Sequence, residues 1–119
     1  MINEFFIPIK IESGNTFIYS HWRVYNAYKN KWKKAMGFLV GRKASQETKR
    51  VFIEIISLRG RLLDEQNLTT GSKPIPDILK SLGWIVDDSP KWLFDRYLQK
   101  LEKDKQERGT IIRVFSELK

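Results

Sequence analysis

The sequence of 119 residues contains no cysteine and only one histidine. Without cysteine there can be no disulfide framework, no thiolate nucleophile and no cysteine-ligated zinc or iron–sulfur cluster. A zinc site with two histidines is also excluded, and a Ser-His-Asp triad would have to use His21. We therefore interpret His21 as a capping or packing residue at the start of a helix.

Long apolar runs are also missing, since none approaches the roughly 20 residues that a membrane-spanning helix needs. Residues 1–10 include Glu4 and alternate apolar with polar residues, unlike the basic-then-apolar layout of a signal peptide. Gly71-Ser72-Lys73 contains part of a phosphate-binding loop, but the full G-x-x-x-x-G-K-[ST] order is absent. We therefore expect a cytoplasmic protein with neither a membrane partner nor a nucleotide cofactor.

Basic residues outnumber acidic ones by 22 to 14, which gives a formal net charge of +8. Such an excess favours a polyanionic partner, and nucleic acid is the leading candidate. The excess is concentrated between residues 21 and 50, where Glu47 is the only acidic residue. We expect DNA contacts in this segment and just beyond it, from Arg23, Lys31, Lys33, Lys34, Arg42, Lys43 and Arg61.

The pattern of apolar residues predicts one domain of the α+β (mixed α/β) class over residues 1–119. Period-two alternation of Ile7, Ile9 and Ile11 predicts a strand over 5–11, and an apolar run predicts a central strand over 51–58. Helices are predicted over 21–40 and 74–82, each ended by a glycine, Gly41 and Gly83. Residues 12–16, at least part of 59–73, and the turn 87–90 are predicted to be loops.

The last third of the chain fits two structures. Leu93, Tyr97, Leu98 and Leu101 lie at helical spacing, which slightly favours a helix. The same residues also fit a strand that forms a hairpin with residues 110–115 through a polar loop ending at Gly109. The residues alone leave both structures open.

Carboxylates gather at the ends of the predicted elements: Asp64, Glu65, Asp77, Asp87 and Asp88. Acids of this kind are usually solvated turn residues. If the fold holds two of them together they repel, and a cation such as magnesium relieves the repulsion. Lys73, four residues before Asp77, fits either an exposed helical ion pair or a cation beside a phosphate. The tryptophans, Trp22, Trp32, Trp84 and Trp92, fit core packing better than stacking on bases.

The order of these residues resembles the signature region of RusA-like Holliday-junction resolvases. That family has roughly R-x-x-D-x-D-N-L, a lysine, an aspartate in the following helix, and then glycine and apolar residues ending in D-D. Here the corresponding segments are Arg61-Leu62-Leu63-Asp64-Glu65-Gln66-Asn67-Leu68, Lys73, Asp77 and Gly83-Trp84-Ile85-Val86-Asp87-Asp88. A looser similarity at Ile7-Pro8, Ser13, Asn15 and His21-Trp22 extends the resemblance over most of the chain.

The resemblance implies a single mixed β-sheet flanked by helices, and it favours the hairpin for the last third. It also implies a homodimer that cleaves four-way junctions or other branched DNA in recombination and repair. Asp64 and Asp88, with Asp87, would hold magnesium that activates water, and Lys73 would assist cleavage. Asn67, Asp77 and Glu65 would support this site.

One position departs from the family pattern, because Gln66 stands where the second motif aspartate is expected. Residues 69–72 also lengthen the path to Lys73 relative to shorter family members. Two functions therefore remain open: a magnesium-dependent endonuclease, and a non-catalytic protein that binds branched DNA on the same fold. A basic protein that binds RNA or a protein partner is the third alternative.

Overall fold

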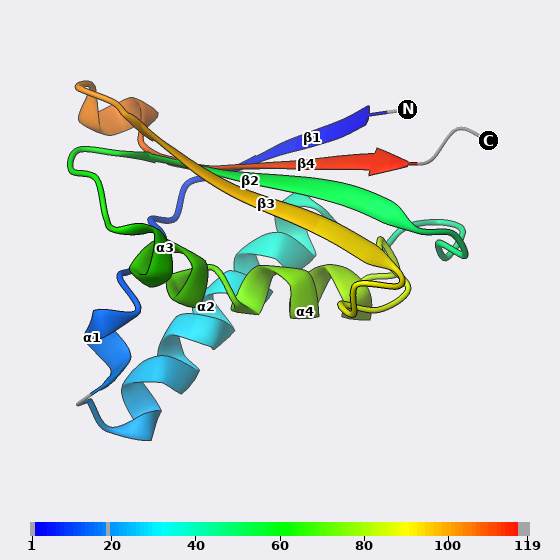
Figure 1. The fold of residues 1–119 in the computed structure, drawn as a ribbon, viewed down its shortest axis with the longest axis horizontal. Coiled ribbons are helices and arrows are strands. Elements are labelled where there is room, and N and C mark those ends of the chain that lie inside the picture. Colours follow the sequence, from blue (N-terminus) through cyan, green and yellow to red (C-terminus); the bar gives the residue numbers. More distant parts are fainter. Residues whose placement is uncertain (1, 19, 117–119) are drawn as a thin grey trace.

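Four strands form one mixed β-sheet, which confirms the predicted fold class. They are β1 (Ile2–Ile7), β2 (Val51–Arg59), β3 (Leu93–Leu101) and β4 (Gly109–Ser116), in the order β1-β4-β2-β3. β4 pairs antiparallel with both β1 and β2, whereas β3 pairs parallel with β2. This computed structural model describes residues 2–18 and 20–116 (Figure 1).

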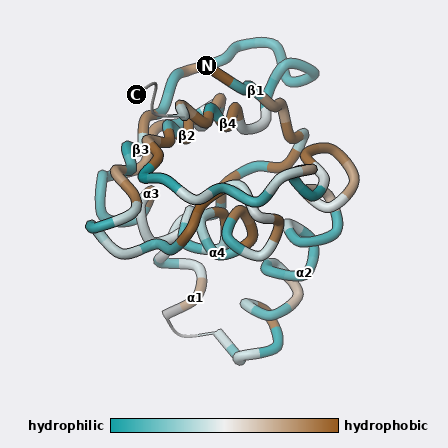
Figure 2. Tube along the Cα trace, turned by 90° about the vertical axis from the view of Figure 1, so that its right-hand side faces the viewer, coloured by the Kyte–Doolittle hydropathy of each residue, from teal (hydrophilic) through white to brown (hydrophobic). Residues whose placement is uncertain are grey.

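The α-helices lie together beneath one face of the sheet, so the molecule has two layers (Figures 1 and 2). They are α1 (Asn15–Ile18), α2 (Trp22–Leu39), α3 (Glu65–Gly71) and α4 (Pro74–Ser81). A short 3-10 helix, Lys105–Glu107, lies in the connection between β3 and β4. No α-helix of the described ranges covers the opposite face, which we call the open face. None of the described helices has the length and apolar content needed to cross a membrane.

The hydrophobic core lies between the two layers. Buried and half-buried residues alternate along β2, because successive side chains of a strand point to opposite faces. Val51, Ile53 and Ile55 point toward the helices and are at most 2% exposed. The helical layer contributes Trp32, Met36, Ile75 and Leu79, each with no exposed surface.

The ends of the two long predicted helices agree with the sequence analysis. His21 is the N-cap of α2, and its ring Nδ1 accepts a hydrogen bond from the Arg23 N–H at 3.1 Å. Gly41 and Gly83 have φ angles of 75° and 84°, in the left-handed region that favours glycine. After α4, the N–H groups of Gly83 and Trp84 donate to the carbonyls of Lys80 and Leu79, which is a Schellman ending.

Two predicted elements differ at their bounds. The first strand ends at Ile7 instead of residue 11, because Pro8 has no N–H and the Ile9 N–H turns back to the Ile7 carbonyl at 2.8 Å. Ile9 and Ile11 remain buried although they have left the sheet. Residues 59–73 are loop in part, as predicted, and they also include α3, because the Asp64 side chain caps a helix in that region. α1 begins within the predicted loop 12–16.

The predicted hairpin is wrong in its pairing. Both of its strands exist, as β3 and β4, but β2 lies between them and pairs with each. β2 has the most continuous apolar sequence, and the central position lets its neighbours cover it on both edges. The chain therefore enters β3 from α4 through a parallel crossover and crosses over β2 to reach β4.

Candidate nucleic-acid interface

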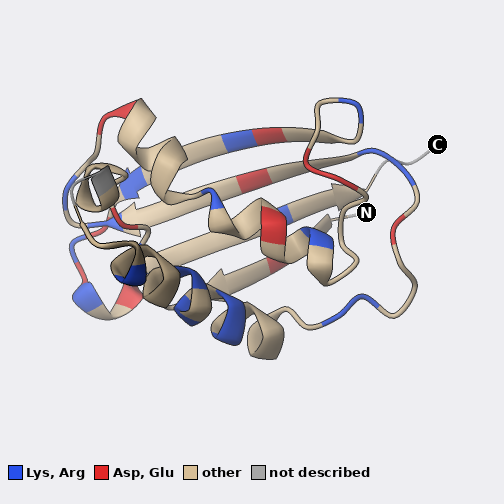
Figure 3. Ribbon diagram, turned by 90° about the horizontal axis from the view of Figure 1, so that it is seen from below, with Lys and Arg blue, Asp and Glu red and all other residues tan. Residues whose placement is uncertain are grey.

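The charged residues of α2 are all basic and all exposed to solvent. Its 18 residues include no acid, and its buried stripe is Tyr28, Trp32 and Met36. The five cations lie outside this stripe and are all exposed: Arg23, Lys29, Lys31, Lys33 and Lys34. Lysine and arginine follow one another along the exposed length of the helix (Figure 3). Such a surface attracts phosphate groups without reading a particular base sequence.

These lysines lie on both flanks of α2. Lys29 and Lys33 line a hollow beside α4 that also includes Asp77. Lys31 and Lys34 line the opposite flank, next to Phe38. Lysine side chains are therefore present on both flanks of the helix. Trp22, 63% exposed at the start of α2, has the Arg23 guanidinium 5.6 Å from its ring centroid.

A second basic region lies at the carboxyl end of β2. Here the chain forms a hollow of about 660 Å³, which we call the β2-end hollow. Its charged lining consists of four cations and two carboxylates: Lys10, Arg59, Arg61, Arg108, Glu12 and Asp64. Because the cations are in excess, the hollow is suited to an anionic group such as a DNA phosphate.

Arg59 holds the wall of the β2-end hollow in place. It is the last residue of β2 and is only 6% exposed, because its side chain points to the helical side of the sheet. Its guanidinium donates to the carbonyls of Ile11 and Arg61, at 2.7 Å each, and to the Ser57 hydroxyl at 3.0 Å. Burial lowers the pKa of Arg59, and the nearby Glu12 carboxylate opposes that change. The residue therefore ties the chain before α1 to the chain after β2.

Tyr28 of α2 is hydrogen-bonded to the segment that carries Glu12, one of the residues lining the hollow. Its hydroxyl donates to the Gly71 carbonyl at 2.6 Å and accepts from the Glu12 N–H at 3.1 Å. Burial of this phenol raises its pKa to about 12. A Cβ added at Gly71 would lie 1.7 Å from the Glu12 carbonyl oxygen, so only glycine allows the two segments to approach this closely. Tyr28 thus links the basic helix to the chain segment at Glu12, which contributes to the lining of the hollow.

Asp64 lines the hollow, but its carboxylate is already engaged. Its two oxygens accept from the backbone N–H of Asn67 at 2.9 Å and from the Asn67 side-chain amide at 2.8 Å. Asp64 is the N-cap of α3, so both bonds belong to the start of that helix. Asn67 and Arg61, two other predicted site residues, line the same hollow.

Two other predicted carboxylates, Asp87 and Asp88, lie between α4 and the start of β3. Asp87 pairs with Lys80 at 2.8 Å, and this contact lowers the pKa of Asp87 and raises that of Lys80. Asp88 lies close enough to Lys80 and Tyr97 for its charge to raise the pKa of each. Asp87 is therefore the contact partner of Lys80, and the charges of Asp88 and Asp77 add smaller contributions to its raised pKa.

The structure does not bring Asp64 and Asp88 together. Asp64 follows the end of β2, whereas Asp88 precedes the start of the parallel strand β3 (Figure 1). The nine paired residues of β2 and β3 span about 26 Å at about 3.3 Å per residue. Within residues 2–18 and 20–116, no group of three or more acidic or histidine side chains is arranged to hold a metal ion. The donor set predicted for magnesium therefore does not fit one ion in this arrangement.

The remaining predicted site residues are spread over the surface. Lys73, between α3 and α4, is exposed and forms no ion pair with any described residue. Glu65 and Gln66 are exposed in the first turn of α3. Arg42 is exposed after α2, but Lys43 pairs with Glu47 at 3.9 Å and donates to the Ser45 carbonyl.

Sequence reasoning missed three of the four cations that line the β2-end hollow: Lys10, Arg59 and Arg108. Arg59 could have been found, because period-two alternation through Val51, Ile53 and Ile55 puts residue 59 on the buried side of β2. Lys10 and Arg108 join the hollow only through the pairing of β4 with β1 and β2. No local pattern marks that pairing.

A scan against protein-family models found no match for this chain, and a search of curated proteins found none either. The similarity to RusA-like resolvases thus rests on the residues quoted from the sequence, and it stays a prediction. The basic helix and the β2-end hollow are properties of this chain itself.

Proposed function

We propose that the protein binds branched DNA, with α2 and the β2-end hollow as its phosphate-contacting surface. The observation that carries the proposal is the set of five exposed cations on α2, a helix without any acidic residue. The excess of cations in the adjoining hollow supports it. Tyr28 links α2 to Glu12 in the lining of the hollow, so the DNA backbone could contact both regions at once. The preference for branched over linear DNA comes from the resemblance to junction resolvases.

Magnesium-dependent cleavage is the second candidate function. Its support is the order of Arg61, Asp64, Lys73 and Asp88 in the sequence, together with the place of Asp64 beside Arg61 in the basic hollow. The separation of Asp64 from Asp88 and the bonds from Asn67 count against it. We therefore rank DNA binding above cleavage.

The binding test compares a synthetic four-way junction with a linear duplex of the same length. The double variant Lys31→Gln, Lys34→Gln removes two charges from α2, and Lys91→Gln, Lys103→Gln removes two exposed charges elsewhere. We expect the junction to bind more tightly than the duplex, and only the α2 variant to weaken binding. Equal, weak binding of both DNA molecules, or equal losses in the two variants, would contradict the proposal.

The same junction, incubated with magnesium, decides between binding and cleavage. We expect a retained complex without nicks in the wild type. Paired nicks that disappear in both Asp64→Asn and Asp88→Asn would instead establish the endonuclease, and would require these two carboxylates to meet in a rearranged state or across two copies. Linear duplex in the same buffer controls for contaminating nucleases.

A further inference from the structure

The side chains of the open face form rows that cross all four strands. The strand register places residues of β1, β4, β2 and β3 side by side in each row. The first row is Ile2, Phe115, Phe52 and Phe94. The next row is charged: Glu4, Arg113, Glu54 and Arg96. The third is again apolar: Phe6, Ile111, Ile56 and Leu98.

The apolar rows remain accessible to solvent. Ile2, Phe94 and Phe6 are 61%, 56% and 44% exposed. The Phe52 ring lies against the rings of Phe94 and Phe115, with centroids 5.1 and 4.9 Å apart. These phenylalanines line an open hollow of about 500 Å³ at this end of the face. Exposed apolar residues that are grouped on one face in this way often form an interaction site.

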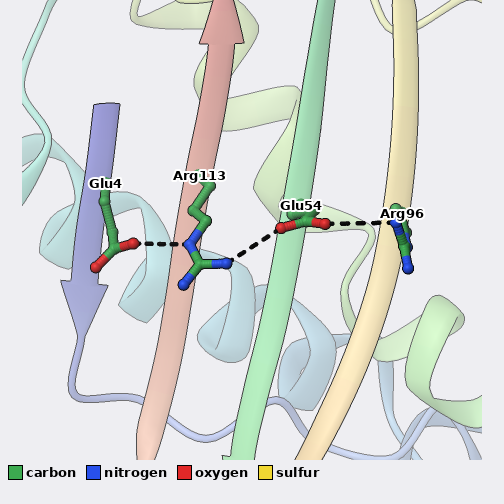
Figure 4. Close-up of polar contacts among 4 residues, drawn as sticks. All are labelled: Glu4, Glu54, Arg96 and Arg113. Carbon is green, nitrogen blue, oxygen red and sulfur yellow. Dashed lines mark hydrogen bonds and ion pairs between the residues drawn. The ribbon is translucent and has the colours of Figure 1, made fainter. Parts of the chain in front are cut away.

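The charged row alternates in sign across the sheet. Arg113 donates from Nε to Glu4 at 2.7 Å and from Nη1 to Glu54 at 3.3 Å, and the other Glu54 oxygen lies 3.6 Å from Arg96 Nη1 (Figure 4). The row runs negative, positive, negative, positive from β1 to β3. If a second copy of this row is laid over it in the opposite direction, from β3 to β1, every negative charge faces a positive charge.

From this pattern we infer that the open face is the interface between two copies of the chain, packed about a two-fold axis parallel to the strands. That axis places β1 of one copy over β3 of the other and β4 over β2. Glu4 then faces Arg96 of the second copy, and Arg113 faces its Glu54. Each apolar row faces itself. A two-fold interface has to be self-complementary, and this arrangement meets that condition.

Other arrangements are less favourable. A two-fold axis across the strands would place Glu4 over Glu4 and Arg96 over Arg96 of the second copy, which brings like charges together.

Four strands about 4.8 Å apart and eight residues long present a face of about 500 Å². Two such faces bury about 1,000 Å² in total, the lower limit for a specific protein interface. The inference names the face and its symmetry, and it does not depend on DNA binding.

Single-stranded nucleic acid is the competing occupant, since it stacks on exposed aromatic residues. The charge of the face argues against it. The central row holds two glutamates and two arginines that pair with one another, so it offers no net positive charge to phosphates. The exposed cations of the acid-free helix α2 lie on the other side of the sheet, in the helical layer (Figure 1).

Sedimentation equilibrium of the full chain over a range of concentrations tests this interface. We expect the wild type to approach twice the 14.1 kDa of one chain. Phe94→Glu places a charge in an apolar row at a half-exposed site and should give the mass of one chain. Phe38→Glu, at an 88% exposed phenylalanine of α2, should leave the doubled mass unchanged. Thermal unfolding of each variant verifies that it folds.

A second experiment tests the symmetry. A variant with all four charges exchanged, Glu4→Arg, Arg113→Glu, Glu54→Arg and Arg96→Glu, keeps the alternation and should still pair with itself. It should not pair with the wild type, because glutamate would then face glutamate. Mixing the two proteins and weighing the complexes by native mass spectrometry should therefore give both homodimers and no heterodimer.

Three outcomes would overturn the inference. The first is a wild type with the mass of one chain at every concentration. The second is free exchange between the wild type and the charge-exchanged variant. The third is a Phe94→Glu variant that keeps its mass but loses binding of a single-stranded oligonucleotide, which would assign the face to nucleic acid.

Discussion

The two faces of the sheet differ in how their apolar residues are grouped. On the helical face they form a continuous layer, from Val51 to Ile55 on β2 and through Ile112 and Val114 on β4, and helices bury it. On the open face a row of charges separates two apolar rows. A continuous apolar face needs a permanent cover, whereas an interrupted one remains soluble alone and can still recognise a matching surface. The pattern on each face thus indicates what covers it.

The largest effect should separate two neighbouring isoleucines of β2. Ile55 is 1% exposed on the helical face, and Ile56 is half-buried on the open face. Ile55→Ala should lower the free energy of unfolding by about 2–5 kcal/mol, because it leaves a cavity in the core. Ile56→Ala should cost about 1 kcal/mol or less at low protein concentration. Urea unfolding measures the unfolding free energy of both variants. Equal losses would contradict the claim that only the helical face is buried in the single chain.

A pair of glycines tests how the helical layer is attached. In Gly71→Ala the added Cβ would overlap the Glu12 carbonyl oxygen, and since backbone must move we expect a loss of about 3 kcal/mol in unfolding free energy. Gly37→Ala is the matched control, because Gly37 lies within α2 with no atom near its added Cβ. That variant should gain about 0.5–1 kcal/mol from helix propensity. Thermal unfolding distinguishes the two signs.

Removing the Tyr28 hydroxyl should affect the helical layer and leave the open face of the sheet unchanged. Tyr28→Phe leaves the Glu12 N–H and the Gly71 carbonyl without this partner, at a cost of about 1–3 kcal/mol of unfolding free energy. The open face makes no contact with this hydroxyl, so the mass of the assembly should stay the same. Urea unfolding and sedimentation of one preparation measure both. A change in mass without a change in stability would contradict the assignment of the two faces.

The raised pKa of Tyr28 adds a pH dependence. Its pKa is about 12 in the folded chain, against an ordinary value of 10.0, so folding favours the neutral phenol. The stabilisation is complete below pH 10 and is lost as the pH rises from 10 to 12. The difference in unfolding free energy between wild type and Tyr28→Phe should therefore shrink over that interval. A constant difference would indicate that the hydroxyl titrates normally.

The sequence predicted the elements better than their arrangement. The helix over 21–40, the strand over 51–58 and the helix over 74–82 agree with α2, β2 and α4, because caps, glycines and apolar periodicity are local signals. The hairpin was wrong because strand pairing is set by packing between distant residues. No short sequence pattern indicates that β2 lies between β3 and β4 in the sheet.

The candidate site likewise has one part that the sequence could predict and another that it could not. Exposure of Arg23, Lys31, Lys33 and Lys34 on one helix follows from spacing, so the basic surface could be predicted. The predicted magnesium site required Asp64, after β2, and Asp88, before β3, to lie close together. Their separation depends on the direction of β3, which the sequence does not reveal. The four cations of the β2-end hollow come from three separate segments, and only the fold assembles them.

The most direct test of the account is the salt dependence and stoichiometry of four-way junction binding, measured for two variants side by side. Lys31→Gln, Lys34→Gln should lower the slope of log affinity against log salt by about 1.8 and leave two chains on each junction. Phe94→Glu should leave the slope for each chain unchanged and halve the number of chains in the first complex formed. An unchanged slope in the α2 variant, or a lowered slope in Phe94→Glu, would contradict the division of DNA binding and self-association between opposite sides of the molecule.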